Sequence, residues 1–300
     1  MKSFELSRER ALLALDGLSV GDALGNFYLY AMNPIEPLIA DRFLPPTPWK
    51  YTDDTEMALG ILEVLRARGG IDQDLLATVF ARRYKADDTR DYGASACDVL
   101  EEIANGGSWR AAAARVFGGR GSMGNGGAMR VAPLAAWFAD DLARVAKEAR
   151  LSAQVTHAHE EGQAGAIAIA VATASACSPS RGILQLRKDL FESALEYCSA
   201  GSTRTGIEAA RLLDAQTNPE QAAKRLGNGS TGTAPETVPF CLWCAARHLD
   251  CFEDAIWTAI EAGGDMDTIS AIIGGIVALA AGRESIPEHW IEAREVLRFK

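Results

Sequence analysis

Two short acidic clusters, one near each end of the chain, hold the residue types best suited to chemistry. Residues 51–56 read YTDDTE and residues 263–268 read GGDMDT. Both combine two carboxylates with threonine hydroxyls, which are the oxygen ligands that Mg²⁺ prefers. If folding brings the clusters together, Asp53, Asp54, Asp265 and Asp267 supply four negative charges. Two divalent cations would balance them and could orient a substrate and activate water.

Helix capping is the alternative explanation, because each cluster runs directly into an apolar stretch and Thr and Asp are favoured N-caps. Asp53 and Glu56 also have the spacing of a capping box. Capping accounts for one acid per helix but not for the second acid beside it. An EF-hand loop is excluded because it needs Glu at its twelfth position. Val64 and Ile276 stand at the two places where that Glu would fall.

A glycine-rich segment, residues 118–127 (GGRGSMGNGG), is the second chemical feature. Its GxGxxG spacing matches a dinucleotide fingerprint, but that motif requires a preceding strand and residues 109–117 have a helical pattern. A P-loop is excluded because no Gly-Lys-Ser/Thr follows. The segment opens into a helix start at 128–134, where backbone N–H groups suit a phosphate. Ser122 and Asn125 would add polar contacts, and a flexible loop without a ligand is the alternative.

Two further patterns argue against metal chemistry elsewhere. His157 and His159 lie two positions apart, so they cannot share a helix face as a zinc pair does, and structural or capping roles are favoured. Cys241 and Cys244 have no second Cys or His pair at zinc spacing. Their spacing is typical of one buried helix face.

Helical periodicity dominates the remaining sequence, and alternating β-branched segments are almost absent. Since no low-complexity linker divides the chain, we expect one all-α domain over residues 1–300, with the acidic clusters facing each other at its centre. The proline-rich stretch 28–51 could be a lid or a crossover connection. Apolar positions recurring at three and four predict helices over 58–68, 74–83, 94–104, 131–137, 164–177, 190–199, 206–215 and 255–262.

Composition narrows the class of protein. With 48% hydrophobic and 23% charged residues, the chain of 300 residues is typical of a globular protein. Its net charge of −10 argues against non-specific nucleic-acid binding and against an anionic membrane surface. The longest apolar stretches, 164–177 and 269–281, are shorter than the roughly 18 residues of a membrane span. Without a signal peptide or a disulfide scaffold, we expect a cytoplasmic monomer.

Taken together, several motifs resemble the ADP-ribosylglycohydrolase family, which includes dinitrogenase-reductase-activating glycohydrolase. The likeness spans roughly residues 13–290. Several motifs occur in the same order as in the family, which makes the resemblance strong. They are residues 21–25 (GDALG), 51–55 (YTDDT), 92–94 (YGA), 121–130 (GSMGNGGAMR), 151–157 (LSAQVTH) and 264–268 (GDMDT).

The resemblance implies a compact, orthogonal bundle of helices around a central cleft that holds two Mg²⁺ or Mn²⁺ ions. It implies metal ligation by Thr52, Asp53, Asp54, Asp265, Asp267 and Thr268. Asp265 and Asp54 would take part in catalysis, with Asp265 positioning or deprotonating the attacking water. The substrate, ADP-ribose on a protein side chain or as an ester, would contact Tyr92, Phe117, Gly121, Ser122, Met123, Gly124, Asn125, Gly126 and His157.

The closest likeness is to the branch that cleaves serine-linked ADP-ribose and O-acetyl-ADP-ribose, with three departures. Leu29 stands where that branch has a Glu beside the metal site, and leucine can neither transfer a proton nor bind a metal. Glu36, in the proline-rich stretch, could take its place. Met123 replaces an aromatic residue of the glycine loop, and Met266 replaces a Thr between the second pair of carboxylates.

The sequence therefore predicts hydrolysis of an α-linked ADP-ribosyl bond. Two alternatives stay open. The first is an ADP-ribose reader in which hydrolysis is weak or lost, and the second is a structural member of the fold related to lens crystallins. Six intact ligand positions argue against both, because a decayed site would often have lost some of them.

Overall fold

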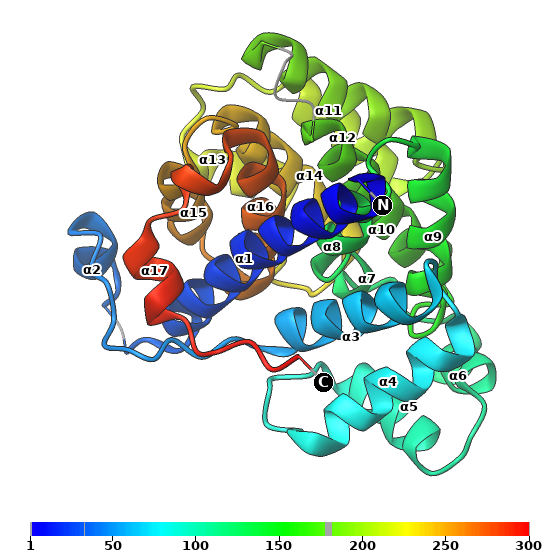
Figure 1. The fold of residues 1–300 in the computed structure, drawn as a ribbon. Helices are drawn as coiled ribbons and strands as arrows, with labels where there is room; N and C mark the ends of the chain where they lie inside the picture. The colour runs from blue at the N-terminus through cyan, green and yellow to red at the C-terminus, as the bar shows by residue number, and fades with distance from the viewer. Residues whose placement is uncertain (1, 33, 178–181, 300) are drawn as a thin grey trace.

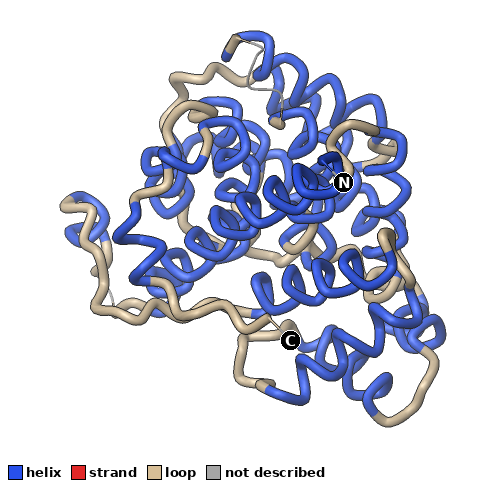
Figure 2. The backbone as a smooth tube through the Cα atoms, in the orientation of Figure 1, coloured by secondary structure: helices blue, strands red, loops and turns tan. Residues whose placement is uncertain are grey.

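The computed structural model describes residues 2–32, 34–177 and 182–299. Over these residues the chain is all helix and loop, as Figure 1 and Figure 2 show, so the all-α prediction is confirmed. The helices are α1 (Lys2–Tyr30), α2 (Glu36–Ala40), α3 (Asp53–Arg68), α4 (Gln73–Ala86), α5 (Ala94–Ala104), α6 (Trp109–Gly119), α7 (Gly126–Met129), α8 (Ala132–Trp137), α9 (Leu142–Gln154), α10 (Glu160–Ala176), α11 (Ile183–Tyr197), α12 (Ser202–Leu212), α13 (Pro219–Leu226), α14 (Ala234–Arg247), α15 (Phe252–Glu261), α16 (Met266–Ala281) and α17 (Glu288–Ala293), with a 3₁₀ turn at Arg283–Ser285.

The predicted helices are all present, and the main differences lie at their starts. Helix α5 has the predicted bounds, whereas α3 begins five residues before the predicted start. Its N-cap is Thr52, whose Oγ1 accepts a hydrogen bond from the Asp54 N–H at 3.3 Å. The alternative of a capping box formed by Asp53 and Glu56 is therefore wrong, although a threonine of the same cluster, Thr52, does cap the helix. The acidic cluster forms the first turn of α3, and the cap leaves its carboxylates free for other partners.

Helices α1 and α16 make the most extensive contact of the fold, and they cross the centre of the molecule (Figure 1). Three glycines spaced four residues apart on α1 permit this approach. A Cβ atom built on Gly17, Gly21 or Gly25 would lie 2.3, 2.2 or 2.3 Å from a backbone oxygen of α16. The last of these contacts is with Met266, at the first turn of α16. The glycines thus bring the end of α1 against the second acidic cluster.

We expect Gly21→Ala to lower the free energy of unfolding by at least about 1–3 kcal/mol, because backbone cannot yield to the added methyl group as a flexible side chain would. Chemical denaturation measures the effect. Gly182→Ala is the matched control, since a Cβ there meets no atom of the described residues within 4 Å. Equal stability of the two variants would contradict the close packing of α1 on α16.

The proline-rich stretch is fixed to the C-terminal segment. Trp49 donates its N–H to the Ala293 carbonyl at 2.7 Å, and the Glu295 N–H donates to the Trp49 carbonyl at 2.9 Å. Tyr28 anchors the middle of the stretch through a 2.6 Å hydrogen bond from its hydroxyl to the Phe43 carbonyl. These contacts give the stretch its place beside α17.

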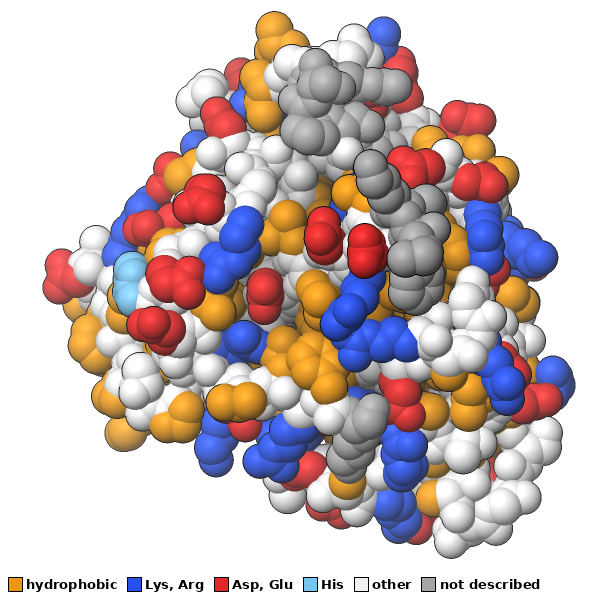
Figure 3. Space-filling view, in the orientation of Figure 1, with side chains coloured by type: hydrophobic (Ala, Val, Ile, Leu, Met, Phe, Trp, Pro, Cys, Tyr) orange, Lys and Arg blue, Asp and Glu red, His pale blue; other side chains and the backbone are white. Residues whose placement is uncertain are grey.

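The surface carries no single charged face in the view of Figure 3, where acidic and basic side chains are interspersed. Among the residues that the structure describes, none of the helices combines the length and the apolar character that a membrane crossing needs.

Candidate functional site

A cavity of about 540 Å³ lies where α3, α7 and α16 meet. The starts of α3 and α16 supply four of the carboxylates that line it, and residues of the loop between α6 and α7 line it as well. All the predicted site residues except Thr52 and Tyr92 line this cavity. They are Asp53, Asp54, Phe117, Gly121, Ser122, Met123, Gly124, Asn125, Gly126, His157, Asp265, Asp267 and Thr268.

The four carboxylates of the two acidic clusters are close enough to perturb one another. Burial raises the pKa of Asp53 well above its usual range, and the neighbouring charges of Asp22 and Asp265 add to the effect. The pKa of Asp54 is raised in the same way, by burial and then by Asp22 and Asp267. Burial and Asp265 raise the pKa of Asp267. The two clusters, distant in sequence, therefore share one electrostatic site.

The carboxylates of the two acidic clusters are not used as helix caps. Asp265 is the N-cap residue of α16, but its side chain makes no capping hydrogen bond. Asp267 accepts one bond, from the Thr268 N–H at 2.9 Å. Oδ2 of Asp54 is buried and has no hydrogen-bond partner among the residues that the structure describes. An unpaired buried carboxylate oxygen among other carboxylates is costly, and a cation would compensate it.

The donor set therefore suits Mg²⁺ or Mn²⁺ by its chemistry, since it consists of carboxylate and hydroxyl oxygens. In the described part of the chain, however, no group of three or more His, Cys, Asp or Glu side chains already has the spacing of a metal site. The carboxylates would have to close around a cation.

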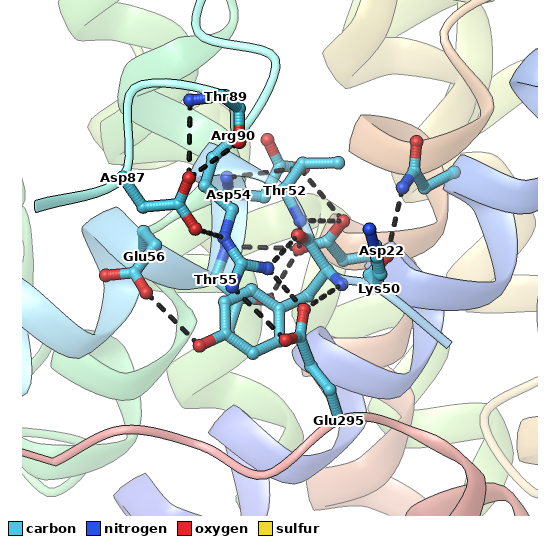
Figure 4. Close-up of polar contacts among 12 residues, drawn as sticks. Asp22, Lys50, Thr52, Asp54, Thr55, Glu56, Asp87, Thr89, Arg90 and Glu295 are labelled. Carbon is cyan, nitrogen blue, oxygen red and sulfur yellow. Dashed lines mark hydrogen bonds and ion pairs between the residues drawn. The ribbon is translucent and has the colours of Figure 1, made fainter. Parts of the chain in front are cut away.

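Asp22 is a site residue that sequence reasoning missed. Its buried carboxylate accepts bonds from the N–H and hydroxyl groups of both Thr52 and Thr55, at distances from 2.5 to 3.1 Å (Figure 4). Burial raises its pKa to about 6 although these bonds act in the opposite direction. Asp22 thus holds the first turn of α3, with Asp53 and Asp54, against α1.

Arg90 holds the same turn from the other side. Its backbone carbonyl accepts the Asp53 N–H at 2.7 Å, and its Nη1 donates to the Tyr51 carbonyl at 2.7 Å. The guanidinium lies over the Tyr51 ring, 4.2 Å from the centroid, and is ion-paired with Glu295 (Figure 4). These contacts hold the backbone of the first acidic cluster in place.

The glycine loop is tied to the second acidic cluster. An isolated antiparallel bridge joins Gly124 to Thr233, and the Asn125 N–H donates to the Gly232 carbonyl at 3.0 Å. The Asn125 side chain, which we expected to contact the substrate, lines the cavity, but its Nδ2 donates to Asp265 Oδ2 at 2.7 Å. Asn125 therefore also orients Asp265.

Phe117 stands at the exposed end of the cavity in a backbone conformation that its size disfavours. It has φ 54° within a kink of α6, and 56% of its side chain is exposed. A bulky residue in the left-handed region is rare and clusters at functional sites. The exposed ring offers a face for stacking of an aromatic base.

The two neighbouring histidines have different roles. His159 caps α10, because its Nδ1 accepts the Glu161 N–H at 3.1 Å, so the capping prediction is confirmed. His157 is buried and faces the glycine loop. Burial, helped by the nearby Arg130 charge, lowers the pKa of His157 to about 3. The imidazole is therefore neutral at physiological pH.

Thr52 and Tyr92 lie outside the cavity lining. The Thr52 hydroxyl donates to Asp22 at 2.9 Å, so it acts in positioning α3. Tyr92 packs edge-on against Tyr84, and the two ring centroids are 5.1 Å apart. In the described part of the chain, the buried hydroxyl of Tyr92 has no hydrogen-bond partner. Burial and then the charge of Asp53 raise the pKa of Tyr92, which places its ring close to the acidic cluster.

Leu29 stands where the serine-cleaving branch has a Glu, and Glu36 was considered as a replacement for that Glu; the structure shows where both residues lie. Leu29 is half-buried against the core and does not line the cavity, and Glu36 is exposed at the start of α2, away from it. No described residue of 31–50 lines the cavity, which favours a crossover connection over a lid. Asp91 does line it, with φ 59°. Its position directly before Tyr92-Gly93 was the only sequence signal.

Comparison with known proteins agrees with this arrangement. The family model described as ADP-ribosylglycohydrolase matches residues 5–298. The chain is similar to ADP-ribosylhydrolase ARH3 of Homo sapiens, with 32% identity over 97% of this chain and 90% of that protein. It is also similar to ADP-ribosylarginine hydrolase Tri1 of Serratia proteamaculans, with 25% identity over 95% of this chain and 75% of the relative.

A solved structure supports the same conclusion. The fold is similar to a chain of an ADP-ribosylglycohydrolase-related protein complex, with a TM-score of 0.72 and 26% identity over 97% of this chain and 94% of the other. The family match thus covers both acidic clusters, the glycine loop and His157. The chain belongs to the ADP-ribosylglycohydrolase family and is an enzyme that hydrolyses ADP-ribosyl bonds.

Proposed function

We propose that the enzyme uses two divalent cations, Mg²⁺ or Mn²⁺, to hydrolyse an α-linked ADP-ribosyl bond on a protein side chain or in a small ADP-ribose ester. One observation carries the proposal. A single cavity is lined by four clustered carboxylates, of which Asp53, Asp54 and Asp267 are buried and Asp265 is half-buried, and also by the glycine loop and the exposed ring of Phe117. These features match, in order, the distal ribose, the pyrophosphate and the adenine of ADP-ribose.

Asp53, Asp54, Asp265 and Asp267, with the Thr268 hydroxyl, would hold the cations. Bound there, the cations would supply Lewis-acid polarisation and a lowered pKa of water. The protein's own residues fix the geometry. Asn125 orients Asp265 so that it can position or deprotonate the attacking water, and the backbone N–H groups of the glycine loop hold the pyrophosphate.

Cation binding should depend on pH in a defined direction. Because the folded-state pKa values of Asp22, Asp53, Asp54 and Asp267 lie above the ordinary value of 3.8, the folded state binds more protons than the unfolded chain above that pH. Raising the pH then lowers the stability of the cation-free protein. A cation requires ionised carboxylates, so its stabilising effect grows with pH.

We therefore expect Mg²⁺ or Mn²⁺ to raise the melting temperature more at pH 7 than at pH 5, and a chelator to reverse the gain at both. Thermal melting with and without cation measures this. In Asp54→Asn the gain should largely disappear. An equal gain at both pH values would contradict binding to the acidic clusters.

Departure of the leaving group calls for a proton donor, and Leu29 cannot supply one. Among the described residues that line the cavity, Asp91 is the acidic side chain outside the four-carboxylate cluster. In its protonated form it would give its proton to the leaving atom and then be reprotonated from solvent. We expect Asp91→Asn to lower kcat on the order of 10²-fold, since a general acid contributes about 10²–10⁴-fold. Affinity for ADP-ribose should be unchanged in calorimetry. Glu36→Gln serves as the control, because Glu36 lies outside the cavity, and an unchanged kcat in Asp91→Asn would remove Asp91 from the reaction.

The linkage can be identified directly. ADP-ribose release from serine-, arginine- and O-acetyl-linked substrates would be measured with Mg²⁺, with Mn²⁺ and with chelator. The arginine-linked substrate is included because one relative is named an ADP-ribosylarginine hydrolase. We expect cation-dependent release from at least one substrate. Tight ADP-ribose binding without any release would favour the reader alternative.

A further inference from the structure

A chain of hydrogen bonds runs from the core to the cavity through Arg130, Thr156 and His157, all of which line the cavity. Arg130 is fully buried, and its Nη2 donates to the Ser152 carbonyl at 3.0 Å and to Thr156 Oγ1 at 2.9 Å. Thr156 Oγ1 in turn lies 2.7 Å from Nδ1 of His157. The direction of each bond can be worked out from the chemistry of the three groups.

Guanidinium can only donate, so Thr156 Oγ1 must accept from Arg130. A threonine hydroxyl has a single proton, and the bond to His157 is the one other contact of this hydroxyl among the described residues. If the hydroxyl accepted from both Arg130 and Nδ1, its own buried proton would have no acceptor, which is costly, so we infer that it donates to Nδ1. A neutral imidazole whose Nδ1 accepts carries its proton on Nε2.

Nε2 of His157 points at the glycine loop. A Cβ atom built on Gly124 would lie 3.1 Å from Nε2, and one built on Gly126 would lie 3.2 Å from it. Within the described part of the chain, no side chain or carbonyl accepts a hydrogen bond from Nε2. The loop glycines thus leave room for a ligand atom beside a free donor.

We propose that Arg130 and Thr156 are positioning residues that fix His157 in the Nε2–H tautomer, so that it donates to an anionic phosphate oxygen in the glycine loop. The inference rests on the proposed function for the identity of that ligand. It also explains how a phosphate is accepted close to four carboxylates. His157 offers a donor that stays uncharged, while the Arg130 guanidinium supplies a fixed positive charge behind it.

The protonation states agree with this assignment. Burial lowers the pKa of Arg130 to about 9, and the Asp53 carboxylate acts against that fall, so the guanidinium keeps its charge near neutral pH. The same charge, together with burial, keeps His157 neutral. Both groups are therefore in the required state throughout the physiological range.

The tautomer can be read from the ring-nitrogen NMR spectrum of protein labelled with ¹⁵N-histidine, which is tractable because the chain has four histidines. We expect Nδ1 of His157 to be unprotonated and Nε2 protonated in the wild type and in Thr156→Ser. Thr156→Val removes the hydroxyl and should allow the other tautomer to appear. A wild-type spectrum with the proton on Nδ1 would overturn the proposal.

Binding gives the second measurement, with ADP-ribose as the probe in calorimetry. Thr156→Val should weaken binding about tenfold, the lower end of the 10–100-fold effects seen for partners that orient a ligating histidine, and Thr156→Ser should restore it. Thr173→Val is the matched control, because Thr173 is equally buried and its hydroxyl donates within α10 to the Ile169 carbonyl. Unchanged affinity in a folded Thr156→Val protein would refute the role in binding.

The two measurements separate this inference from the proposed function. One outcome is that no substrate is hydrolysed, but the tautomer is as expected and Thr156→Val binds ADP-ribose more weakly. The positioning role of Arg130 and Thr156 would then be supported and the proposed hydrolysis refuted. If substrate is hydrolysed but His157 of the wild type carries its proton on Nδ1, the positioning role of Arg130 and Thr156 is refuted and the proposed function is supported.

Discussion

Asp54→Asn is expected to reduce kcat about a thousandfold while leaving the fold intact. Asp54 is buried at the centre of the four-carboxylate cluster, and its Oδ2 has no partner within the described residues. Losing a ligand that anchors the cations removes several kcal/mol of transition-state stabilisation, which corresponds to roughly 10³-fold in rate. Steady-state hydrolysis of the best ADP-ribosyl substrate measures the loss.

The same substitution should not destabilise the cation-free protein. Burial and the charges of Asp22 and Asp267 raise the pKa of Asp54, so ionising it opposes folding, and a neutral amide removes that repulsion. We expect a melting temperature at pH 7 without cation equal to or above that of the wild type. Asp250→Asn, at an exposed position, controls for the loss of one carboxylate. Near-normal turnover in Asp54→Asn would rule out catalysis by cations held at Asp54.

Asp54 is expected to be needed for activity but not for stability, and this difference explains why the acidic clusters could be predicted from the sequence. Residues selected for ligand binding, such as Asp53 and Asp54, break the local rules of a buried helix turn, so they stand out in the sequence. The helical periodicity and the glycine loop are also local patterns. The all-α fold, the acidic clusters and the glycine loop could therefore be inferred from local patterns, whereas Phe117, Met123 and His157 were assigned to the site only by the family resemblance.

What could not be inferred depends on contacts between distant segments. Asp22 lies in the motif of residues 21–25 that carries the family resemblance, but its bonding role appears only when Gly21 and Gly25 bring α1 against α16. The Thr52 hydroxyl has the chemistry of a ligand, yet in the fold it bonds to Asp22. The family likeness predicted that Phe117 contacts the substrate, whereas its strained φ of 54° is visible only in the structure.

Asp22→Asn tests whether Asp22 on α1 holds the first acidic cluster in place. We expect this substitution to lower both stability and activity. All the groups that face Asp22 are donors, namely the N–H and hydroxyl groups of Thr52 and Thr55. An asparagine of the same shape keeps one acceptor oxygen but turns an NH₂ group towards donors. The free energy of unfolding should fall by about 2–4 kcal/mol, because hydrogen bonds to a charged acceptor are lost and buried donors are left unsatisfied.

Activity should fall with it, because Asp22 fixes the turn that carries Asp53 and Asp54. We expect kcat to drop about 10–100-fold in protein that is still folded, and the cation-induced rise in melting temperature to shrink. A graded series separates positioning from folding: Thr55→Ser keeps the 2.5 Å bond from the hydroxyl to Asp22, whereas Thr55→Val removes that bond alone. Thr55→Ser should behave like the wild type, and Thr55→Val should lie between it and Asp22→Asn. Wild-type stability and turnover in Asp22→Asn would mean that Arg90 and the glycine contacts of α1 hold the cluster without help from Asp22.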